Sequence, residues 1–234
     1  MKIEIWSDIV CPFCYIGKRR FESAMEQFEH SGKVSIEYKS FQLNPNTVTD
    51  TTISAHENLA MHKGITVEQA KQMGDQVTQM AKEVGLHYDF DKAVVANTFN
   101  AHRLLHFAKD FGKQIEAKEL LLKAYFTEGK NIDDLNELKN IIEILELNSA
   151  EFEKNMSDDQ FTNEVRSDIQ EAGQLRIQGV PFYVFDRKYG VSGAQSADVF
   201  LQTLSKSYEE WSQNQNQEAL NITKGESCDV DGNC

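Results

Sequence analysis

Two cysteines separated by two residues are the part of this sequence best suited to chemistry. The segment Cys11-Pro12-Phe13-Cys14 follows alternating apolar residues and precedes a stretch with helical periodicity. A cysteine at the start of a helix faces unpaired backbone N–H groups and the positive end of the helix dipole, which favour the thiolate. Pro12 suits the first helical turn because it has no N–H to leave unpaired. The pattern predicts a redox dithiol in which Cys14 attacks a mixed disulfide formed at Cys11.

The other two cysteines, Cys228 and Cys234, lie more than 200 residues further along the chain. Zinc sites usually contain two pairs of ligands that are each close in sequence, so we expect no metal site here. A zinc site built from all four cysteines is an alternative. Inert burial of Cys11 and Cys14 is another alternative, since cysteine is often buried without function. For Cys228 and Cys234 we hypothesise a second redox pair that a flexible tail brings to the first, against the competing interpretation of an incidental terminus.

The elements around the dithiol predict a strand, a helix and a second strand. Residues 2–7 alternate polar and apolar, residues 12–30 have helical spacing, and residues 34–41 alternate again. A strand, a helix and a strand within fifty residues form a βαβ unit, which implies a parallel strand pair and a right-handed crossover. The dithiol would then lie where the first strand passes into the helix.

The rest of the chain divides into a helical stretch and a return to strands. From about residue 52 to 176 nearly everything has helical period, with helices expected at 66–84, 91–111, 116–128, 134–145, 149–155 and 158–175. Strands are expected at 182–185 and 189–192, and a last helix at 197–211. We therefore predict an α/β fold (βαβ…ββα) interrupted by a large all-helical insertion. Its domains would be 1–46 with 176–212, the insertion 47–175, and a tail 213–234 that carries the second cysteine pair.

Composition excludes some classes of function. The chain of 234 residues has 24 Lys and Arg against 37 Asp and Glu, a net charge of −13, which argues against nucleic acid and anionic membrane surfaces as partners. No apolar run approaches the roughly 20 residues that span a bilayer. The first residues lack a signal-peptide pattern, so we expect a reducing cytoplasm, where structural disulfides are rare. Redox or metal chemistry is the more plausible use of the cysteines.

Four segments carry a resemblance to a known family. Ser7-Asp8-Ile9-Val10-Cys11-Pro12-Phe13-Cys14-Tyr15-Ile16-Gly17 resembles the active-site segment of the DsbA-family thioredoxin-like oxidoreductases, specifically their FrnE-like branch. Segments 97–103, 179–182 and 191–195 resemble later motifs of that branch, and the likeness covers about residues 1 to 210. It implies a thioredoxin fold with an inserted helical domain, Cys11 as the exposed nucleophile and Cys14 as the resolving thiol.

The resemblance also implies how substrate is held. Val180-Pro181 would be a cis-peptide loop facing the dithiol. The residues themselves leave cis and trans open, because cis costs little before proline. A cis bend would leave the Val180 backbone free to pair with an extended peptide. Pro12, Phe13, Asn97 and His102 are expected to line the substrate cleft, although ordinary helix-surface polarity also explains Asn97.

These features predict thiol–disulfide exchange on protein or peptide substrates, with no cofactor and with glutathione or another thiol as the recycling reductant. Oxidase, reductase and isomerase share the same residues and differ in redox potential, so the direction is left open. The alternative is a glutathione-dependent transferase or isomerase of the kappa-class or 2-hydroxychromene-2-carboxylate isomerase type. Those proteins share the scaffold but, as the resemblance implies, carry a serine in place of Cys11. A non-catalytic binding module on a thioredoxin scaffold is a third class.

Overall fold

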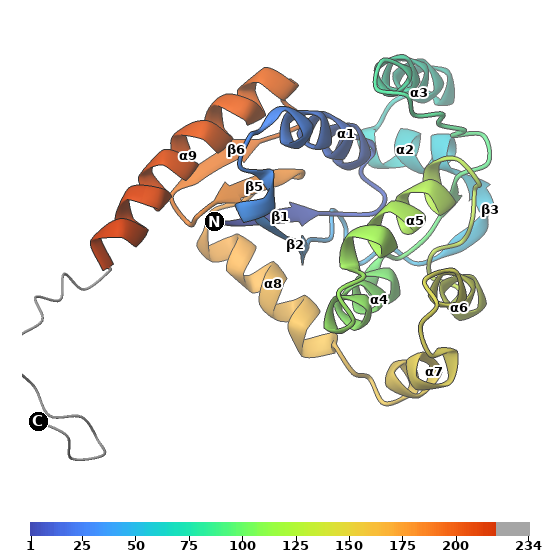
Figure 1. Ribbon diagram of the computed structural model, residues 1–234. Helices are drawn as coiled ribbons and strands as arrows, with labels where there is room; N and C mark the ends of the chain where they lie inside the picture. Colours follow the sequence, from blue (N-terminus) through green and yellow to red (C-terminus); the bar gives the residue numbers. More distant parts are fainter. Residues whose placement is uncertain (219–234) are drawn as a thin grey trace, which may run out of the picture.

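A four-stranded mixed sheet joins segments from both ends of the chain. The computed structural model describes residues 1–218. The strand order is β2-β1-β5-β6, where β1 is Lys2–Ser7, β2 is Ser35–Ser40, β5 is Phe182–Phe185 and β6 is Tyr189–Ser192. β1 runs parallel to β2 and antiparallel to β5, which pairs with β6 as a hairpin (Figure 1). The βαβ unit and the late hairpin predicted from the sequence are confirmed.

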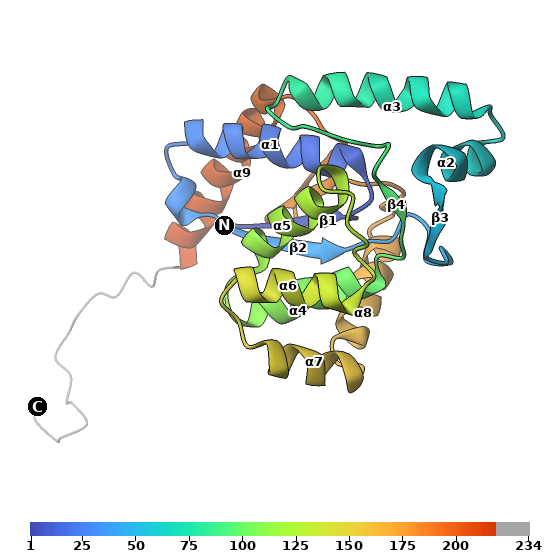
Figure 2. The ribbon, with the colours of Figure 1, turned by 90° about the vertical axis from the view of Figure 1, so that its right-hand side faces the viewer.

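Helices cover both faces of this sheet (Figure 2). α1 (Pro12–Gln27) and α9 (Ala197–Glu218) lie on one face, and a short 3-10 turn (Ser31–Lys33) leads from α1 to β2. The alternation in β1 directs Ile3 and Ile5 into a core with aromatic side chains of α1 and α9. Trp6 points to the opposite face, where its indole N–H donates to the Asp168 carbonyl of α8 (Thr162–Gln174) at 3.0 Å.

The remaining helices come from the middle of the chain. They are α2 (Ala55–Lys63), α3 (Val67–Lys82), α4 (Phe99–Asp110), α5 (Gln114–Phe126), α6 (Leu135–Ile144) and α7 (Ser149–Ser157). Their core, which includes Leu104, Phe107 and Phe126, also contains Tyr15 and Ile16 of α1. The insertion is therefore packed against the beginning of α1, next to the dithiol.

Three features differ from the sequence prediction. The segment expected to be all-helical also contains an antiparallel pair, β3 (Asp50–Ser54) and β4 (Val94–Val95). Consequently the helix expected over 91–111 begins only at Phe99. Two residues are too few to show the alternation of apolar and polar residues that marks a strand, which explains why the sequence did not predict β4. α9 also runs to Glu218, beyond the expected end at Trp211, because the intervening residues include no glycine or proline to stop it.

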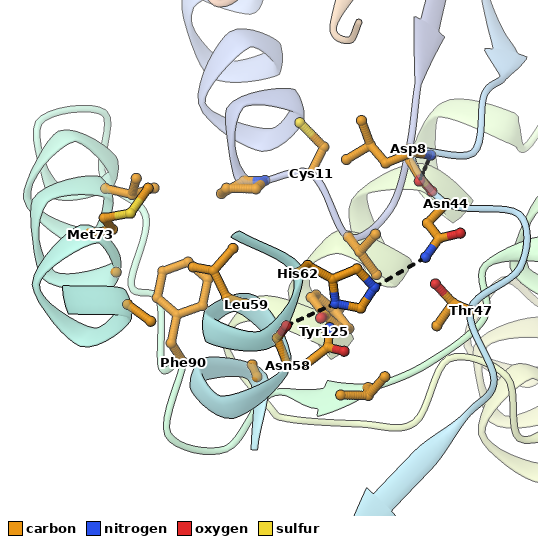
Figure 3. Close-up of a pocket in the computed structure, with 18 of the residues that line it drawn as sticks. Asp8, Cys11, Asn44, Thr47, Asn58, Leu59, His62, Met73, Phe90 and Tyr125 are labelled. Carbon is orange, nitrogen blue, oxygen red and sulfur yellow. Dashed lines mark hydrogen bonds between the residues drawn. The ribbon is translucent and has the colours of Figure 1, made fainter. Parts of the chain in front are cut away.

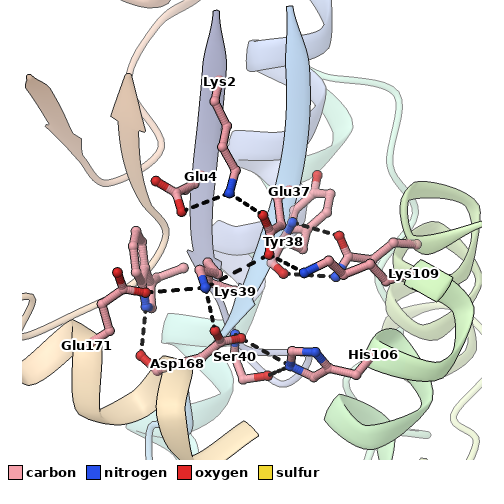
Figure 4. A network of polar contacts seen from close by, with 12 residues as sticks. Lys2, Glu4, Glu37, Tyr38, Lys39, Ser40, His106, Lys109, Asp168 and Glu171 are labelled. Atoms are coloured by element: carbon pink, nitrogen blue, oxygen red, sulfur yellow. Dashed lines mark hydrogen bonds and ion pairs between the residues drawn. The ribbon is translucent and has the colours of Figure 1, made fainter. Parts of the chain in front are cut away.

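A partly buried polar network attaches α4 and α8 to the edge strand β2 (Figure 4). The Asp168 carboxylate accepts hydrogen bonds from the Ser40 backbone N–H at 2.9 Å and from Lys39 Nζ at 2.7 Å. His106 Nε2 lies 3.1 Å from the same carboxylate, and Lys109 of α4 pairs with Glu37. Asp168 thus provides an acceptor for the Ser40 N–H, a backbone group of an edge strand that would otherwise be unpaired. Among residues 1–218, no helix is both long and apolar enough to cross a bilayer.

Candidate active site

The dithiol lies where β1 passes into α1. Cys11 is the N-cap residue of α1, Pro12 is its first residue, and the Cys14 backbone N–H donates to the Cys11 carbonyl at 3.0 Å. The helix start predicted from the sequence is therefore confirmed. Both thiols are free and largely buried, with 4% and 3% of their surface exposed.

The two cysteines differ in what they face. Cys11 lines a cavity of about 560 Å³, together with Pro12, Phe13 and Val180, whereas Cys14 is not among its lining residues. Figure 3 shows Cys11 at the beginning of α1, above the space enclosed by α2, α3 and the loop around Asn44. A molecule in the cavity therefore reaches Cys11 first.

Most of the cavity wall is apolar. Its apolar side chains come from the dithiol loop, the loop after β2, helices α2 and α3, and the segment between α3 and β4: Val10, Phe13, Leu43, Leu59, Met73, Val77 and Phe90. A smaller polar side contains His62, whose Nδ1 lies 2.8 Å from the Asn58 carbonyl and whose Nε2 lies 3.4 Å from Asn44 Nδ2. Such a wall excludes water from a disulfide bound at Cys11 and provides polar groups along one side only.

The segment before β5 faces the dithiol from the other side. The Val180–Pro181 peptide bond is cis. The Cys11 thiol donates to the Val180 carbonyl, with 3.4 Å between sulfur and oxygen. The Pro181 carbonyl accepts from the Gly193 N–H at 2.8 Å, which ties this loop to the end of β6. Val180 therefore presents its backbone directly beside the reactive sulfur.

Gly17 sets how closely α1 approaches this loop. A Cβ atom at Gly17 would lie 2.7 Å from Tyr183 Oη and 3.1 Å from Pro181 Cγ. We expect Gly17→Ala to lower the free energy of unfolding by about 1–3 kcal/mol, because both neighbours are packed and must shift. It should also slow disulfide exchange by displacing the Val180 carbonyl from Cys11. Urea unfolding and exchange rates measure the two effects.

Gly173→Ala is the matched control for this substitution. Gly173 also lies in a helix, α8, but a Cβ atom there meets nothing within 4 Å. Its replacement by alanine should be neutral or stabilising by up to about 1 kcal/mol, as helix propensity predicts. Equal stability and equal exchange rates for the two alanine variants would contradict a role for Gly17 in close packing.

Asp8 is a buried carboxylate that the sequence did not single out. It accepts hydrogen bonds from the Ile9 N–H and the Leu43 N–H, both at 2.8 Å, and from His102 Nε2 at 3.2 Å. Burial opposes its ionisation, but the hydrogen bonds and the charges of its neighbours hold its pKa below the ordinary value. Burial lowers the pKa of His102 despite Asp8, so a neutral imidazole donates its Nε2 proton. Asp8 thus joins the dithiol loop, the Leu43 loop and α4.

Two residues expected to line the substrate cleft are placed elsewhere. His102 has no exposed surface and is not part of this cavity wall, and its Nε2 contacts Asp8 instead. A direct contact of His102 with substrate stays a prediction. The Asn97 side chain also lies outside the wall, and it donates to the Thr47 carbonyl at 2.7 Å and accepts from the Phe99 N–H at 2.8 Å. Thr47 does line the cavity, so Asn97 supports the wall from behind.

The two thiols affect each other's ionisation. Hydrogen bonding to Cys14 and burial raise the pKa of the Cys11 thiol well above its ordinary value. Burial also opposes ionisation of Cys14, but its hydrogen bond with Cys11 and the charge of Lys118 hold the pKa of the Cys14 thiol below the ordinary value. The pair therefore loses its first proton as a unit. The sequence argument from the helix dipole, which favours the thiolate at Cys11, stays a prediction.

The other predicted cysteine chemistry lies outside the part of the chain that the structure describes. Cys228 and Cys234 are both beyond residue 218, so a second redox pair and a four-cysteine zinc site stay predictions. Within residues 1–218, no three His, Cys, Asp or Glu side chains are grouped so that they could hold a metal ion.

Comparisons with known proteins show the family of this chain. The model of the DSBA-like thioredoxin domain matches residues 2–205. The uncharacterized protein YwbO of Bacillus subtilis is 27% identical over 208 residues, 87% of this chain and 95% of that protein. The crystal structure of a probable DsbA oxidoreductase from Streptomyces coelicolor is 35% identical, with a TM-score of 0.84 over 99% of this chain and 97% of that one.

A more distant similarity concerns the fold alone. The cytosolic disulfide reductase DsbM from Pseudomonas aeruginosa, in a structure with GSH, is 13% identical to this chain. The TM-score is 0.62, over 92% of this chain and 100% of that one.

Proposed function

This chain belongs to the family of the DSBA-like thioredoxin domain, and from that membership we propose that it exchanges disulfides with protein or peptide substrates through Cys11 and Cys14. The fold is thioredoxin-like with a helical insertion. The observation that carries the proposal is the difference between the two thiols, since only Cys11 borders the cavity. Cys11 is the nucleophile and Cys14 the resolving thiol. Membership of the FrnE-like branch stays a prediction.

In the reducing direction, the Cys11 thiolate attacks a substrate disulfide. One substrate sulfur bonds to Cys11 and the other leaves as a thiolate. Cys14 then attacks Cys11 Sγ, the bond from Cys11 to substrate breaks, and the substrate departs as a second thiolate. The substrate gains two electrons and, from solvent, two protons, while Cys11 and Cys14 are oxidised to a disulfide. The oxidising direction is the reverse, and the Val180–Pro181 loop holds the substrate strand in both.

Exchange of this kind needs only sulfur chemistry, so we propose no cofactor, with glutathione or another thiol as the recycling reductant. A cytoplasmic location is proposed as well. Both proposals rest on the sequence, because the similarity to DsbM, which is named cytosolic and whose structure contains GSH, concerns the fold alone. The apolar wall beside Cys11 supports a peptide substrate, because an extended chain can place apolar side chains against it while its backbone meets Val180.

Transfer of a disulfide tests the proposal. The full chain is oxidised with glutathione disulfide, freed of glutathione and mixed with a peptide dithiol. We expect the peptide to lose two hydrogens and Cys11 and Cys14 to regain them, as mass spectrometry of both molecules would show. A glutathione transferase or isomerase predicts instead that turnover with glutathione survives Cys14→Ser. A protein that forms no Cys11–Cys14 disulfide, or never passes it on, would sink the proposal.

A further inference from the structure

Lys118 is a buried cation without a hydrogen-bond partner. Its side chain has no exposed surface, and within the described residues its Nζ donates no hydrogen bond. The Nζ atom lies over the Tyr38 ring, 5.6 Å from the ring centre, a position that stabilises a cation only weakly. Buried ammonium groups are rare unless an anion compensates them. Lys118 therefore needs a negative charge nearby.

Two sets of contacts hold Lys118 behind the dithiol. Gln114, one turn earlier on α5, exchanges two hydrogen bonds of 2.9 Å with the backbone of Tyr38 on the edge strand β2. Glu119, the next residue, accepts from Tyr15 Oη at 2.5 Å and from Lys18 Nζ at 2.6 Å on α1. α5 is thus fastened to the sheet and to the dithiol helix on either side of Lys118.

The charged and titratable groups that act on Lys118 come from every neighbouring element. Burial lowers the pKa of Lys118; the charge of Cys14 on α1 opposes this most strongly, followed by those of Asp8 and Cys11, while the charge of Lys18 adds to the lowering. Tyr38 contributes its ring from β2, and His102 of α4 is neutral. Asp8 is already occupied by two backbone N–H groups and His102. Cys14 is also hydrogen-bonded, to Cys11 and to the Asp8 backbone, and its charge is the one that most strongly favours the charged form of Lys118.

We propose that Lys118 is the counter-cation of the Cys14 thiolate and thereby makes the Cys11–Cys14 disulfide more oxidising. This inference rests on the proposed function. Lys118 does not touch substrate and acts only through Cys14. Because Lys118 lies on α5, one of the inserted helices would thus influence the redox potential of the dithiol in the thioredoxin-like part.

The effect follows from the leaving group in the oxidising direction. A substrate thiolate attacks Cys11 Sγ of the disulfide, a bond from substrate to Cys11 forms, and the Cys11–Cys14 bond breaks. Its electron pair leaves on Cys14 as a thiolate, next to the Lys118 ammonium. A leaving thiol with a lower pKa departs faster, and a stabilised thiolate favours the reduced protein at equilibrium. A second substrate thiolate then displaces Cys11, and the substrate is oxidised by two electrons.

Lys118→Met tests this role because methionine keeps an unbranched side chain and removes the charge. We expect the thiolate absorbance at 240 nm of the reduced variant to titrate about one to three pH units higher than that of the wild type. In glutathione redox buffers, the equilibrium should move toward the protein disulfide by about tenfold or more, which is about 30 mV toward a more reducing potential. The free energy of unfolding should stay equal or rise, since an unpaired buried charge is removed.

Lys18→Met is the matched control, because it removes another buried lysine whose charge is already paired with Glu22 and Glu119. It should leave the thiolate titration and the redox equilibrium within twofold of the wild type. Lys118→Gln, which also lacks the charge, should repeat the shift seen with methionine. An unchanged potential in both Lys118 variants would overturn the inference, whereas absence of any Cys11–Cys14 disulfide in the wild type would overturn the proposed function.

Discussion

Replacing Cys11 by serine is expected to lower the rate of disulfide exchange by about a thousandfold or more, a loss of about 4 kcal/mol in transition-state stabilisation. A serine hydroxyl is far less acidic than a thiol and forms no stable bond to a substrate sulfur. Cys11 is also the only cysteine of the pair that lines the cavity, so Cys14 cannot take over the attack. Steady-state exchange with a fluorescent peptide disulfide measures the effect.

Cys14→Ser is the matched variant, because it makes the same atomic change three residues later in the chain. This variant should still attack a substrate disulfide once, since Cys11 remains at the cavity. It should then stop at the mixed disulfide, because no resolving thiol follows. Single-turnover kinetics would therefore show a normal first release of substrate thiol without further turnover. Loss of that first release in Cys14→Ser, with retention in Cys11→Ser, would reverse the two roles.

Asp8→Ala should lower the free energy of unfolding at pH 7 by about 3 kcal/mol. The substitution removes the acceptor for the Ile9 and Leu43 N–H groups, which are left buried or half-buried without a partner. It also removes the partner of His102, which is completely buried. Asp110→Ala, at an exposed position on α4, should change stability by less than about 0.5 kcal/mol. Urea unfolding monitored by tryptophan fluorescence would compare the three proteins.

The pH dependence of the difference in unfolding free energy between the wild type and Asp8→Ala identifies the cause of that difference. The pKa of Asp8 is lower in the folded protein than in the unfolded chain, so its contribution is complete above about pH 3.9 and is lost as the pH falls toward the folded pKa. The gap between the wild type and Asp8→Ala should therefore narrow below about pH 3.9. A gap that stays constant between pH 7 and 3 would show that Asp8 contributes packing rather than charge.

Much of the fold follows from local sequence patterns. Alternation in residues 2–7 and 35–40 and helical spacing after Pro12 were sufficient to predict the parallel pair and the position of the dithiol. The hairpin β5–β6 was predictable from two short apolar runs around a turn. The pair β3–β4 was not, because its pairing joins residues some forty positions apart and its second strand has only two residues.

The candidate site was predictable where its residues adjoin in sequence. Cys11, Pro12 and Cys14 lie together, so their spacing indicated their chemistry. Lys118 gave no signal, because a lysine in a helix is usually exposed and only the packing of α5 against β2 and α1 buries it. His102 illustrates the opposite case: a polar helix residue expected at the cleft is buried because Asp8 provides its partner.

The most direct test of the central claim is the mass of Cys14→Ser after it meets a peptide disulfide. The intact variant and its proteolytic fragments are analysed under non-reducing conditions, with Cys11→Ser treated in parallel. We predict one covalently attached peptide half, joined to Cys11, and none on Cys11→Ser. An adduct of equal yield on Cys11→Ser, joined to Cys14, would contradict the assignment of Cys11 as the nucleophile.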